Sequence, residues 1–293
     1  MDIIEWVLAI AVLFCFGVMS SSGLGADFGT LSAIVTIFGG LALVFVHGVR
    51  RYGWRLLVFF FVVTWVVSNI CENLSILTGF PFGHYTYTGE PKIFLVTWFI
   101  DLTYFIFGYS AWTLSNILLE QADTHLNLKS TLGKVNLFLI PLTSAVVKTL
   151  WDLRMDSQSS TIDHRRIWRN GGAFFGVGAK NYFGWVFVTW MFFQIFTITL
   201  TVLQTRNSDG LSTVKPARSA TAIVPYFSTG IAAISTYSSS RGITSTVRDG
   251  GGTVWKESDI YTSMMVISVL TVVALSVIRF GKILRGDEKR NVK

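Results

Sequence analysis

The sequence predicts an all-α fold, a polytopic bundle of about eight transmembrane helices, from three observations. Charged residues make up only 14% of the 293 residues, whereas about 25% is usual in a soluble domain. The mean hydropathy is high, at +0.54. The apolar residues also come in blocks close to the ~20 residues that cross a bilayer. Because backbone polar groups find no water inside lipid, each block is expected to be a helix.

Eight apolar blocks organise the chain into one integral-membrane domain, residues 1–293, without an internal repeat or a soluble domain. The predicted spans are residues 3–22, 28–47, 56–77, 93–119, 135–153, 182–203, 221–237 and 260–280. Pro141, Lys148 and Asp152 interrupt the fifth span, and Pro225 weakens the seventh. The loops 204–220 and 238–258 are rich in Ser, Thr and Gly, so we expect flexible connectors there.

The net charge of +7 comes mostly from basic residues at the ends of the apolar blocks, where topology and anionic head groups account for them. We therefore expect the lipid bilayer as a partner and no nucleic acid. Lys and Arg are more frequent in the loops on the side of the two termini, which predicts cytoplasmic termini. The expected membrane is the endoplasmic reticulum in a eukaryote and the inner membrane in a bacterium.

Four carboxyl groups, those of Glu72, Asp101, Asp152 and Asp156, lie within or just beyond the predicted spans. A charge at the bilayer centre costs at least ~2.5 kcal/mol, so such residues are candidates for function. Glu72 belongs to a polar stripe at the end of the third span, where it either serves chemistry or reaches interfacial water. Asp101 stands alone in the middle of an aromatic-rich span. Desolvation favours its protonated form, which either donates a proton or bonds to a neighbouring helix.

Lys148, Asp152 and Asp156 are spaced by four residues and therefore share one helix face. We expect Lys148 and Asp152 to form an ion pair. Asp152 and Asp156 could share a proton, or they could hold a divalent cation between them. The chain has no HExxH motif and no clustered His and Cys residues, so neither a resident metal nor a cofactor is expected.

Two stretches carry more specific information. In the first, Glu72 precedes the loop Gly79-Phe80-Pro81-Phe82-Gly83-His84-Tyr85-Thr86-Tyr87. The second holds Asp152-x-x-x-Asp156, then Gly171-Gly172-Ala173-Phe174-Phe175-Gly176, then Asn181-Tyr182-Phe183-Gly184-Trp185. Over about residues 65–190 these motifs resemble the membrane carotenoid-hydratase family, which adds water across the terminal double bond of acyclic carotenoids, and the related eight-span fungal cyclases of terpenoids and meroterpenoids. The chain departs from the family pattern at Ser157, where proline is usual.

The resemblance implies an enzyme that protonates a terminal alkene or epoxide of a long isoprenoid, its expected hydrophobic small-molecule partner. An internal nucleophile then captures the cation in a cyclase, or water does so in a hydratase. The catalytic candidates are Glu72, Asp101, Asp152 and Asp156. Aromatic faces stabilise cations. The candidate substrate-binding residues are Phe80, Phe82, His84, Tyr85, Tyr87, Trp98, Trp151, Phe174, Phe175, Asn181 and Trp185.

The predicted topology places loops 78–92 and 154–181 on the same side of the membrane, so the two motif stretches can meet. We expect the loop from Phe80 to Tyr87 to cap a pocket whose floor includes Glu72, and Glu72 and Asp152 to face one cavity. Two other functions stay open. Asp152 and Asp156 could hold Mg²⁺ against a prenyl diphosphate, whose phosphates would be bound by Arg154, Arg165, Arg166 and Arg169. Alternatively, Lys148 and Asp152 could be the coupling site of a transporter.

Overall fold

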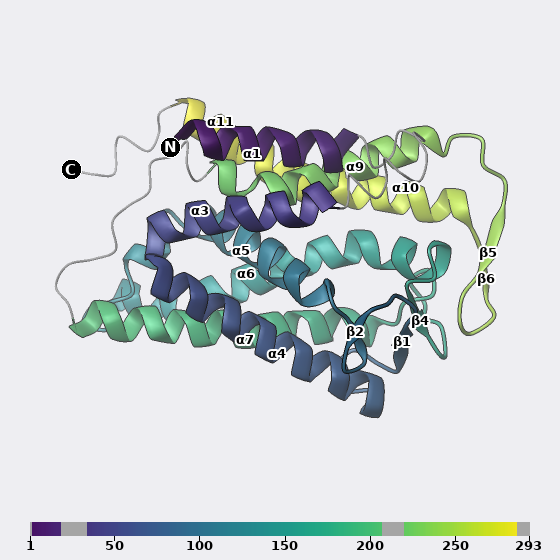
Figure 1. Ribbon diagram of the computed structural model, residues 1–293, viewed down its shortest axis with the longest axis horizontal. Coiled ribbons are helices and arrows are strands. Elements are labelled where there is room, and N and C mark those ends of the chain that lie inside the picture. Colours follow the sequence, from purple (N-terminus) through teal and green to yellow (C-terminus); the bar gives the residue numbers. More distant parts are fainter. Residues whose placement is uncertain (1, 19–33, 207–219, 286–293) are drawn as a thin grey trace.

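The protein is a bundle of long helices with short strands gathered at one end (Figure 1). The computed structural model describes residues 2–18, 34–206 and 220–285. Within these ranges the longer helices are α1 (Asp2–Val12), α3 (Gly40–Tyr52), α4 (Trp54–Thr78), α5 (Ile100–Leu118), α6 (Thr131–Ser157), α7 (Ala179–Arg206), α9 (Val224–Ser239), α10 (Glu257–Ser268) and α11 (Ala274–Arg285). Shorter π-helical segments extend some of them, namely η1 (Leu13–Val18), η3 (Val35–Gly39), η5 (Gln158–Ile162) and η6 (Val269–Val273), and η4 (Ala122–Thr124) is a 3-10 turn.

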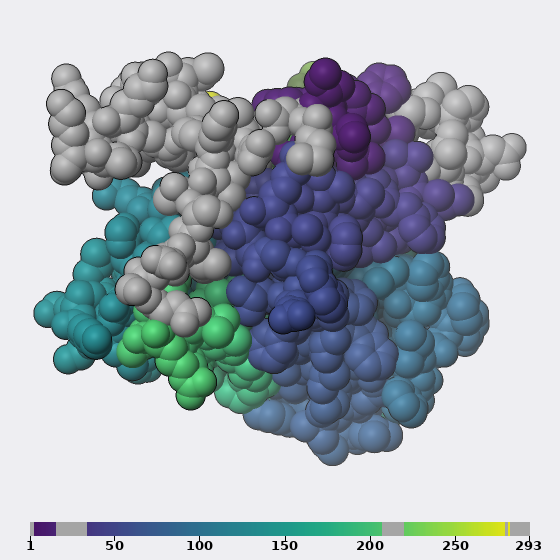
Figure 2. Space-filling view, turned by 60° about the vertical axis from the view of Figure 1, so that its left-hand side comes forward, coloured from purple at the N-terminus to yellow at the C-terminus, as the bar shows by residue number. Residues whose placement is uncertain are grey.

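Helix α5 forms the centre of the core. It contacts α3, α4, α6 and α9, and it is buried all the way from Tyr104 to Ile117. A helix that is apolar on every side belongs in such a position. The ring of Trp112 packs against Phe193 and Phe196 of α7, and α6 packs along α7. Figure 2 shows the face made by α3 and α4, with the last turns of α7 (green) beside them.

Each of the eight predicted spans coincides with a helical region in the part that the structure describes. In that part, the helices long and apolar enough to cross a membrane are α4, α7 and the continuous stretch Glu257–Ile278. Helix α9 has 16 residues, fewer than the ~20 that a straight crossing needs. The helical fold is therefore confirmed, and the number of eight crossings stays a prediction. Residues 19–33, between the first two predicted spans, lie outside the described ranges.

The start of the fourth predicted span is wrong. Residues 93–99 are not helical, because β2 (Lys92–Ile93) pairs with β3 (Val96–Thr97) in a hairpin, and α5 begins only at Ile100. Val96 is fully buried, whereas Phe94 and Leu95 in the turn are exposed. Burial therefore accounts for the apolar side chain of Val96 and not for the rest of this apolar run.

The fifth predicted span is longer and less interrupted than expected. Helix α6 begins after Ser130, whose hydroxyl caps it by accepting the Gly133 N–H at 3.0 Å, and it continues through Pro141 to Ser157. Lys148 and Asp152 do not break it because they bond to each other in the core. The ion pair offsets part of the cost of burying two charges.

Loop 238–258 is not the flexible connector that its composition suggests. It contains the hairpin of β5 (Thr246–Arg248) and β6 (Val254–Lys256), closed by Asp249, whose Oδ1 accepts the N–H groups of Gly251 and Thr253. A Cβ on Gly250 would overlap the carbonyl oxygen of Trp168. Glycine at position 250 therefore allows the β5–β6 hairpin to approach the backbone of β4 closely. Most of loop 204–220 lies outside the described residues.

Candidate active site

Glu72 lies near the C-terminal end of α4, where three tyrosine hydroxyls surround its fully buried carboxylate. Tyr85 and Tyr87 both donate to Oε2, the latter at 2.9 Å, and Tyr104 of α5 donates to Oε1 at 2.6 Å. The stripe expected on α4 is therefore turned into the protein and away from water. The pocket expected above Glu72 is filled by these tyrosine side chains.

The two motif stretches meet, as the predicted topology requires. Strand β1 (Tyr85–Tyr87) pairs antiparallel with β4 (Arg166–Trp168), with Tyr85 opposite Trp168 and Tyr87 opposite Arg166. Alternate side chains of a strand point to opposite faces, so Tyr85 and Tyr87 both point inward while Thr86 is exposed. The pairing thus places the phenols of Tyr85 and Tyr87 and the guanidinium of Arg166 together in the buried region around Glu72.

The turn before β1 is built around Ser75 and Gly79. Gly79 ends α4 in the left-handed conformation (φ 77°), and its N–H bonds to the Ser75 carbonyl at 2.8 Å. The Ser75 hydroxyl donates to the carbonyl of Gly83 at 2.8 Å and accepts the Phe82 N–H at 3.0 Å. The chain reversal therefore holds Phe82 close to α7, where a Cβ on Gly184 would lie only 2.8 Å from its ring.

Burial raises the pKa of both Tyr85 and Tyr87 well above the ordinary value of a phenol, and the charge of Glu72 raises it further. Both hydroxyls therefore keep their protons and remain hydrogen-bond donors to Glu72. Burial alone would lower the pKa of Arg166, but the charge of Asp156 above all, and that of Glu72 as well, raises it. Arg166 is accordingly a permanent cation at this site.

Asp101 lies in the first turn of α5, not in the middle of a span, and it is not alone. Its carboxyl is fully buried against α4, where Ser68 Oγ lies 2.9 Å from Oδ1 and Asn69 Nδ2 donates to Oδ2 at 2.9 Å. Ser68 and Asn69 lie one helical turn before Glu72 on α4. The Asp101 carboxyl that they contact therefore lies against the same face of α4 as the carboxyl of Glu72. Among the described residues, no cationic side chain bonds to either of them.

Lys148 and Asp152 form the predicted ion pair on α6, with Nζ 2.8 Å from Oδ2. The other oxygen of Asp152, Oδ1, is buried without a hydrogen-bond partner in the part of the chain that the structure describes. Asp156 does not share a proton with Asp152, because it has partners of its own. Arg166 forms an ion pair with its Oδ1, and Asn181 donates to its Oδ2 at 2.6 Å.

Aromatic rings connect the two groups of carboxyls. The ammonium of Lys148 lies 4.2 Å from the ring centroid of Trp151 and 4.3 Å from that of Trp185. Trp185 stacks on Tyr104 at 4.7 Å, and the hydroxyl of Tyr104 bonds to Glu72. The structure thereby brings Glu72 and Asp152 into one buried cluster, with a cation already seated between aromatic faces.

The remaining candidate substrate-binding residues divide between this cluster and its surroundings. Phe82 packs against Trp185 within it. Phe80 and His84 are exposed, and half-buried Trp98 packs on Phe99. Phe174 and Phe175 pack on each other, with Phe175 also against Trp255 of β6. The structure places these five residues outside the carboxyl cluster.

Buried polar atoms without a partner gather at this site. Within the described ranges they include Asp152 Oδ1, the Nε1 atoms of Trp151 and Trp185, Arg154 Nε and Asn181 Oδ1. Buried polar groups are nearly always bonded in folded proteins, so such a concentration requires an explanation. These atoms belong to the end of α6 and the beginning of α7. They could bind water or a polar group of a substrate.

Sequence reasoning missed Tyr104 as a member of the site, and it named Arg166 only among the arginines that could bind a diphosphate. Tyr104 lies three residues after Asp101, on the same helix face, which was an available signal. Arg166 belongs to the stretch Asp163-His164-Arg165-Arg166, in which no motif distinguishes it from its neighbours. Only the β1–β4 pairing identifies it.

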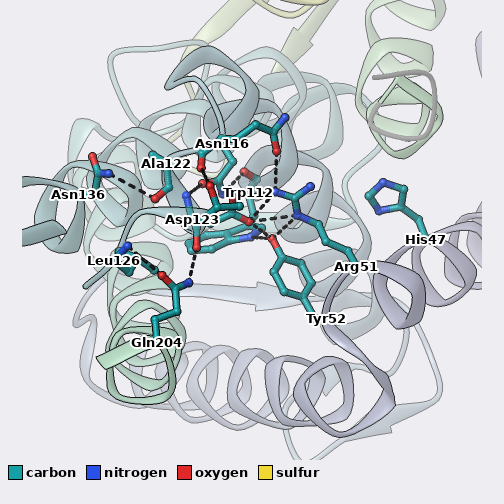
Figure 3. A network of polar contacts seen from close by, with 12 residues as sticks. His47, Arg51, Tyr52, Trp112, Asn116, Ala122, Asp123, Leu126, Asn136 and Gln204 are labelled. Atoms are coloured by element: carbon teal, nitrogen blue, oxygen red, sulfur yellow. Dashed lines mark hydrogen bonds and ion pairs between the residues drawn. The ribbon is translucent and has the colours of Figure 1, made fainter. Parts of the chain in front are cut away.

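A second buried polar network, also missed, joins α3, the α5–α6 connection and α7 (Figure 3). Arg51 bonds to Asp123 with 2.7 Å between its NH2 nitrogen and Oδ1, and Tyr52 donates to the same carboxylate. Trp112 Nε1 donates to the Tyr52 hydroxyl at 2.9 Å, and Gln204 Nε2 donates to the carbonyl of Asp123 at 2.6 Å. This Arg51–Asp123 network fastens the connection between α5 and α6 to the bundle.

Fold and site together define a helical membrane protein with a cluster of buried carboxyl groups among aromatic rings. Residues 31–245 match the family described as carotenoid biosynthesis protein, and the chain belongs to that family. No curated protein and no solved structure matches the chain. Membership supports an enzymatic role in carotenoid biosynthesis.

Proposed function

We propose that this protein is an acid-initiated isoprenoid cyclase or hydratase. Its substrate is a long isoprenoid chain with a terminal alkene or epoxide, of the carotenoid, terpenoid or meroterpenoid type. The observation that carries the proposal is the cluster itself. Four carboxyls and three cationic side chains (Lys148, Arg154 and Arg166) are buried together among indole and phenol rings. One carboxyl is in excess of the cations, and an uncompensated buried charge is costly. The cluster therefore stores a proton.

The proton comes from the Glu72–Asp101 pair, since these two carboxyls have no bonded cation among the described residues. In the first step, the O–H bond of the acid breaks and a C–H bond forms at the less substituted alkene carbon. The π electrons make that bond and leave a tertiary cation. An epoxide would instead be protonated on oxygen and open. General acid catalysis of this kind contributes about 10²–10⁴-fold to a rate.

The cation is stabilised by the faces of Trp151, Trp185 and Tyr104. Two of these rings, Trp151 and Trp185, already contact the Lys148 ammonium at 4.2 and 4.3 Å, which supports the capacity of this aromatic surface to bind a positive charge. A nucleophile then forms the final bond to the cationic carbon. If that nucleophile is water or a hydroxyl, Asp152 Oδ1 accepts the proton it releases, since this buried oxygen lacks a partner.

An apolar groove of about 380 Å³ between α3 and α4 supports access from the bilayer. It is lined by Leu41, Ala42, Phe45, Leu57, Val58, Phe61 and Phe105. Phe105 follows Tyr104 on α5, but Leu57, Val58 and Phe61 belong to the first two turns of α4, so the groove lies toward the end of α4 that is farther from Glu72. An isoprenoid tail is as apolar as the groove.

Product mass analysis tests the proposal. The full-length protein is expressed in a host supplied with acyclic carotenoids or prenylated compounds, and the extracts are compared with those from Glu72→Gln. A mass gain of one water identifies hydration, and an unchanged mass at a new retention time identifies cyclisation. Products that are the same with Glu72→Gln, or a diphosphate as the only compound consumed, would contradict the proposal.

A further inference from the structure

The side-chain amide of Asn73 has a single possible orientation. The backbone N–H of Leu95 donates to Asn73 Oδ1 at 3.0 Å, and Asn73 Nδ2 donates to the backbone carbonyl of Asn69 at 2.8 Å. A backbone N–H is always a donor and a backbone carbonyl always an acceptor, so the oxygen and nitrogen of this amide cannot be exchanged. Leu95 lies in the turn of the β2–β3 hairpin. The hairpin therefore determines the orientation of Asn73.

The orientation of Asn73 in turn determines that of Asn69. Asn73 Nδ2 also donates to Asn69 Oδ1 at 3.1 Å, which leaves Asn69 Nδ2 to donate to Asp101 Oδ2 at 2.9 Å. Oδ2 of Asp101 is consequently an acceptor. If this acid carries a proton, the proton belongs on Oδ1.

Ser68 is able to accept such a proton. Its Oγ lies 2.9 Å from Asp101 Oδ1 and 3.2 Å from the backbone carbonyl of Trp65. A hydroxyl has one proton but two lone pairs. A helical serine commonly gives its proton to a carbonyl of the preceding turn. With the Ser68 proton on the Trp65 carbonyl, Oγ becomes an acceptor for Asp101.

We infer that Asp101 carries its proton on Oδ1, directed at Ser68 Oγ, and that Asn69 and Asn73 are positioning residues that fix this acid to the β2–β3 hairpin. The use of that proton in catalysis rests on the proposed function. The position of the proton on Asp101 Oδ1 is argued from the geometry alone. Glu72, the carboxyl one turn along α4, receives three hydroxyl donors. Asp101 has one amide donor and one hydroxyl that can act as an acceptor.

Infrared spectroscopy of the purified full-length protein without substrate tests the location of the proton. The carbonyl stretch of a protonated carboxylic acid is separate from the bands of carboxylates. We expect such a band at neutral pH in wild type and its loss in Asp101→Asn. If the two spectra show no difference there, Asp101 is ionised and the inference is overturned.

The chain of hydrogen bonds from Leu95 through Asn73 and Asn69 to Asp101, here called the relay, is tested by the frequency of the carbonyl band of protonated Asp101. Asn69→Ala removes the donor to Oδ2, so the carbonyl stretch should move to higher frequency. Asn73→Ala should move it in the same direction by less, because the Asn69 amide then loses only its fixed orientation. Asn73→Ser provides a milder variant if Asn73→Ala does not fold. Its hydroxyl can accept the Leu95 N–H, and its single proton goes to the backbone carbonyl of Asn69, so none is left for the Asn69 side chain. Asn136→Ala is the matched control, since Asn136 donates only to the backbone carbonyls of Ala122 and His125, and the band should not move.

The outcomes separate this inference from the proposed function. A band that stays fixed in both Asn73 variants contradicts the relay, whatever the activity. Conversely, the band could respond as expected while Asp101→Asn turns over substrate at the wild-type rate. That result would support the position of the proton but contradict the role of Asp101 as the acid. In the active enzyme, Asn73→Ser should lower kcat with little change in KM, because it misplaces the acid and touches no substrate.

Discussion

The Arg51–Asp123 network and the carboxyl cluster are two buried polar regions near opposite ends of α4. Tyr52 ends α3 just before α4 begins at Trp54, and about 27 Å of α4 separates Trp54 from Glu72, at about 1.5 Å per residue. In the first region, Arg51, Tyr52, Trp112 and Asp123 have no buried side-chain polar atom without a partner (Figure 3). In the second, Asp152, Trp151 and Trp185 each have one.

The difference indicates what each region is for. A saturated network has no bonding capacity left for a ligand, so it stabilises one packing of the helices. A cluster that buries charges and leaves indole N–H groups and a carboxylate oxygen unbonded lowers stability, and such exceptions concentrate at functional sites. Substitutions in the first region should therefore change stability, and those in the second should change turnover.

The largest expected effect is on stability, from Arg51→Met. The variant leaves Asp123 as an uncompensated buried charge, which costs about 3–5 kcal/mol of the free energy of unfolding. Thermal unfolding in detergent measures it. The double variant Arg51→Met with Asp123→Leu should recover part of the loss because no charge remains unpaired. A wild-type melting temperature for Arg51→Met would show that this network does not hold the bundle together.

Next in size are Glu72→Gln and Asp152→Asn, each of which should reduce kcat by about 10²-fold or more, the lower range for general acid–base catalysis. Both substitutions keep the shape of the side chain. Glu72→Gln unpairs no cation and should melt as wild type does, whereas Asp152→Asn leaves Lys148 buried without its carboxylate and should lower the melting temperature. The measurement is turnover per folded protein. Normal turnover in both would remove the carboxyl cluster from the chemistry.

Gly250→Ala should destabilise the protein by about 1–3 kcal/mol, the usual cost of overpacking. Its Cβ would overlap the carbonyl oxygen of Trp168, so the β5–β6 hairpin would have to move away from β4. Gly178→Ala is the control, because nothing lies within 4 Å of a Cβ there. Limited proteolysis of the hairpin reports the change. Equal cleavage of the two variants would contradict the packing described for Gly250.

Trp185→Leu should reduce turnover by about tenfold, since a cation–π contact in a dry site contributes about 1–2 kcal/mol. Trp54→Leu is the matched control, as Trp54 is exposed at the other end of α4. The comparison is made on kcat for the same substrate. If both variants behave alike, aromatic faces in the cluster have no special part in stabilising the cation.

The smallest expected effect is that of EDTA, which should leave turnover unchanged. Asp152 and Asp156, the pair that could hold Mg²⁺ against a diphosphate, each bond to a cationic side chain of the protein. Activity that disappears with EDTA and returns with Mg²⁺ would favour the prenyl diphosphate hypothesis.

Much of the fold follows from patterns that are local in the sequence. Apolar blocks near 20 residues long predict the helical regions because lipid and a helical core both require satisfied backbone groups. The spacing of Lys148 and Asp152 predicts their ion pair because four residues make about one helical turn. Errors arise where an apolar run forms a hairpin instead of a helix, as in residues 92–97, or where glycines serve close packing, as at Gly250.

What the sequence by itself determined is which segments are helical, which carboxyls lie within them and which family the motifs resemble. Apart from the Lys148–Asp152 pair, the tertiary structure alone decided the partners of the buried carboxyls. Glu72 meets Tyr104, Asp156 meets Arg166 and Arg51 meets Asp123 across different elements of the bundle. The physical reason is that a hydrogen bond acts over about 3 Å. Its partners are therefore set by how the elements pack, which local spacing does not encode.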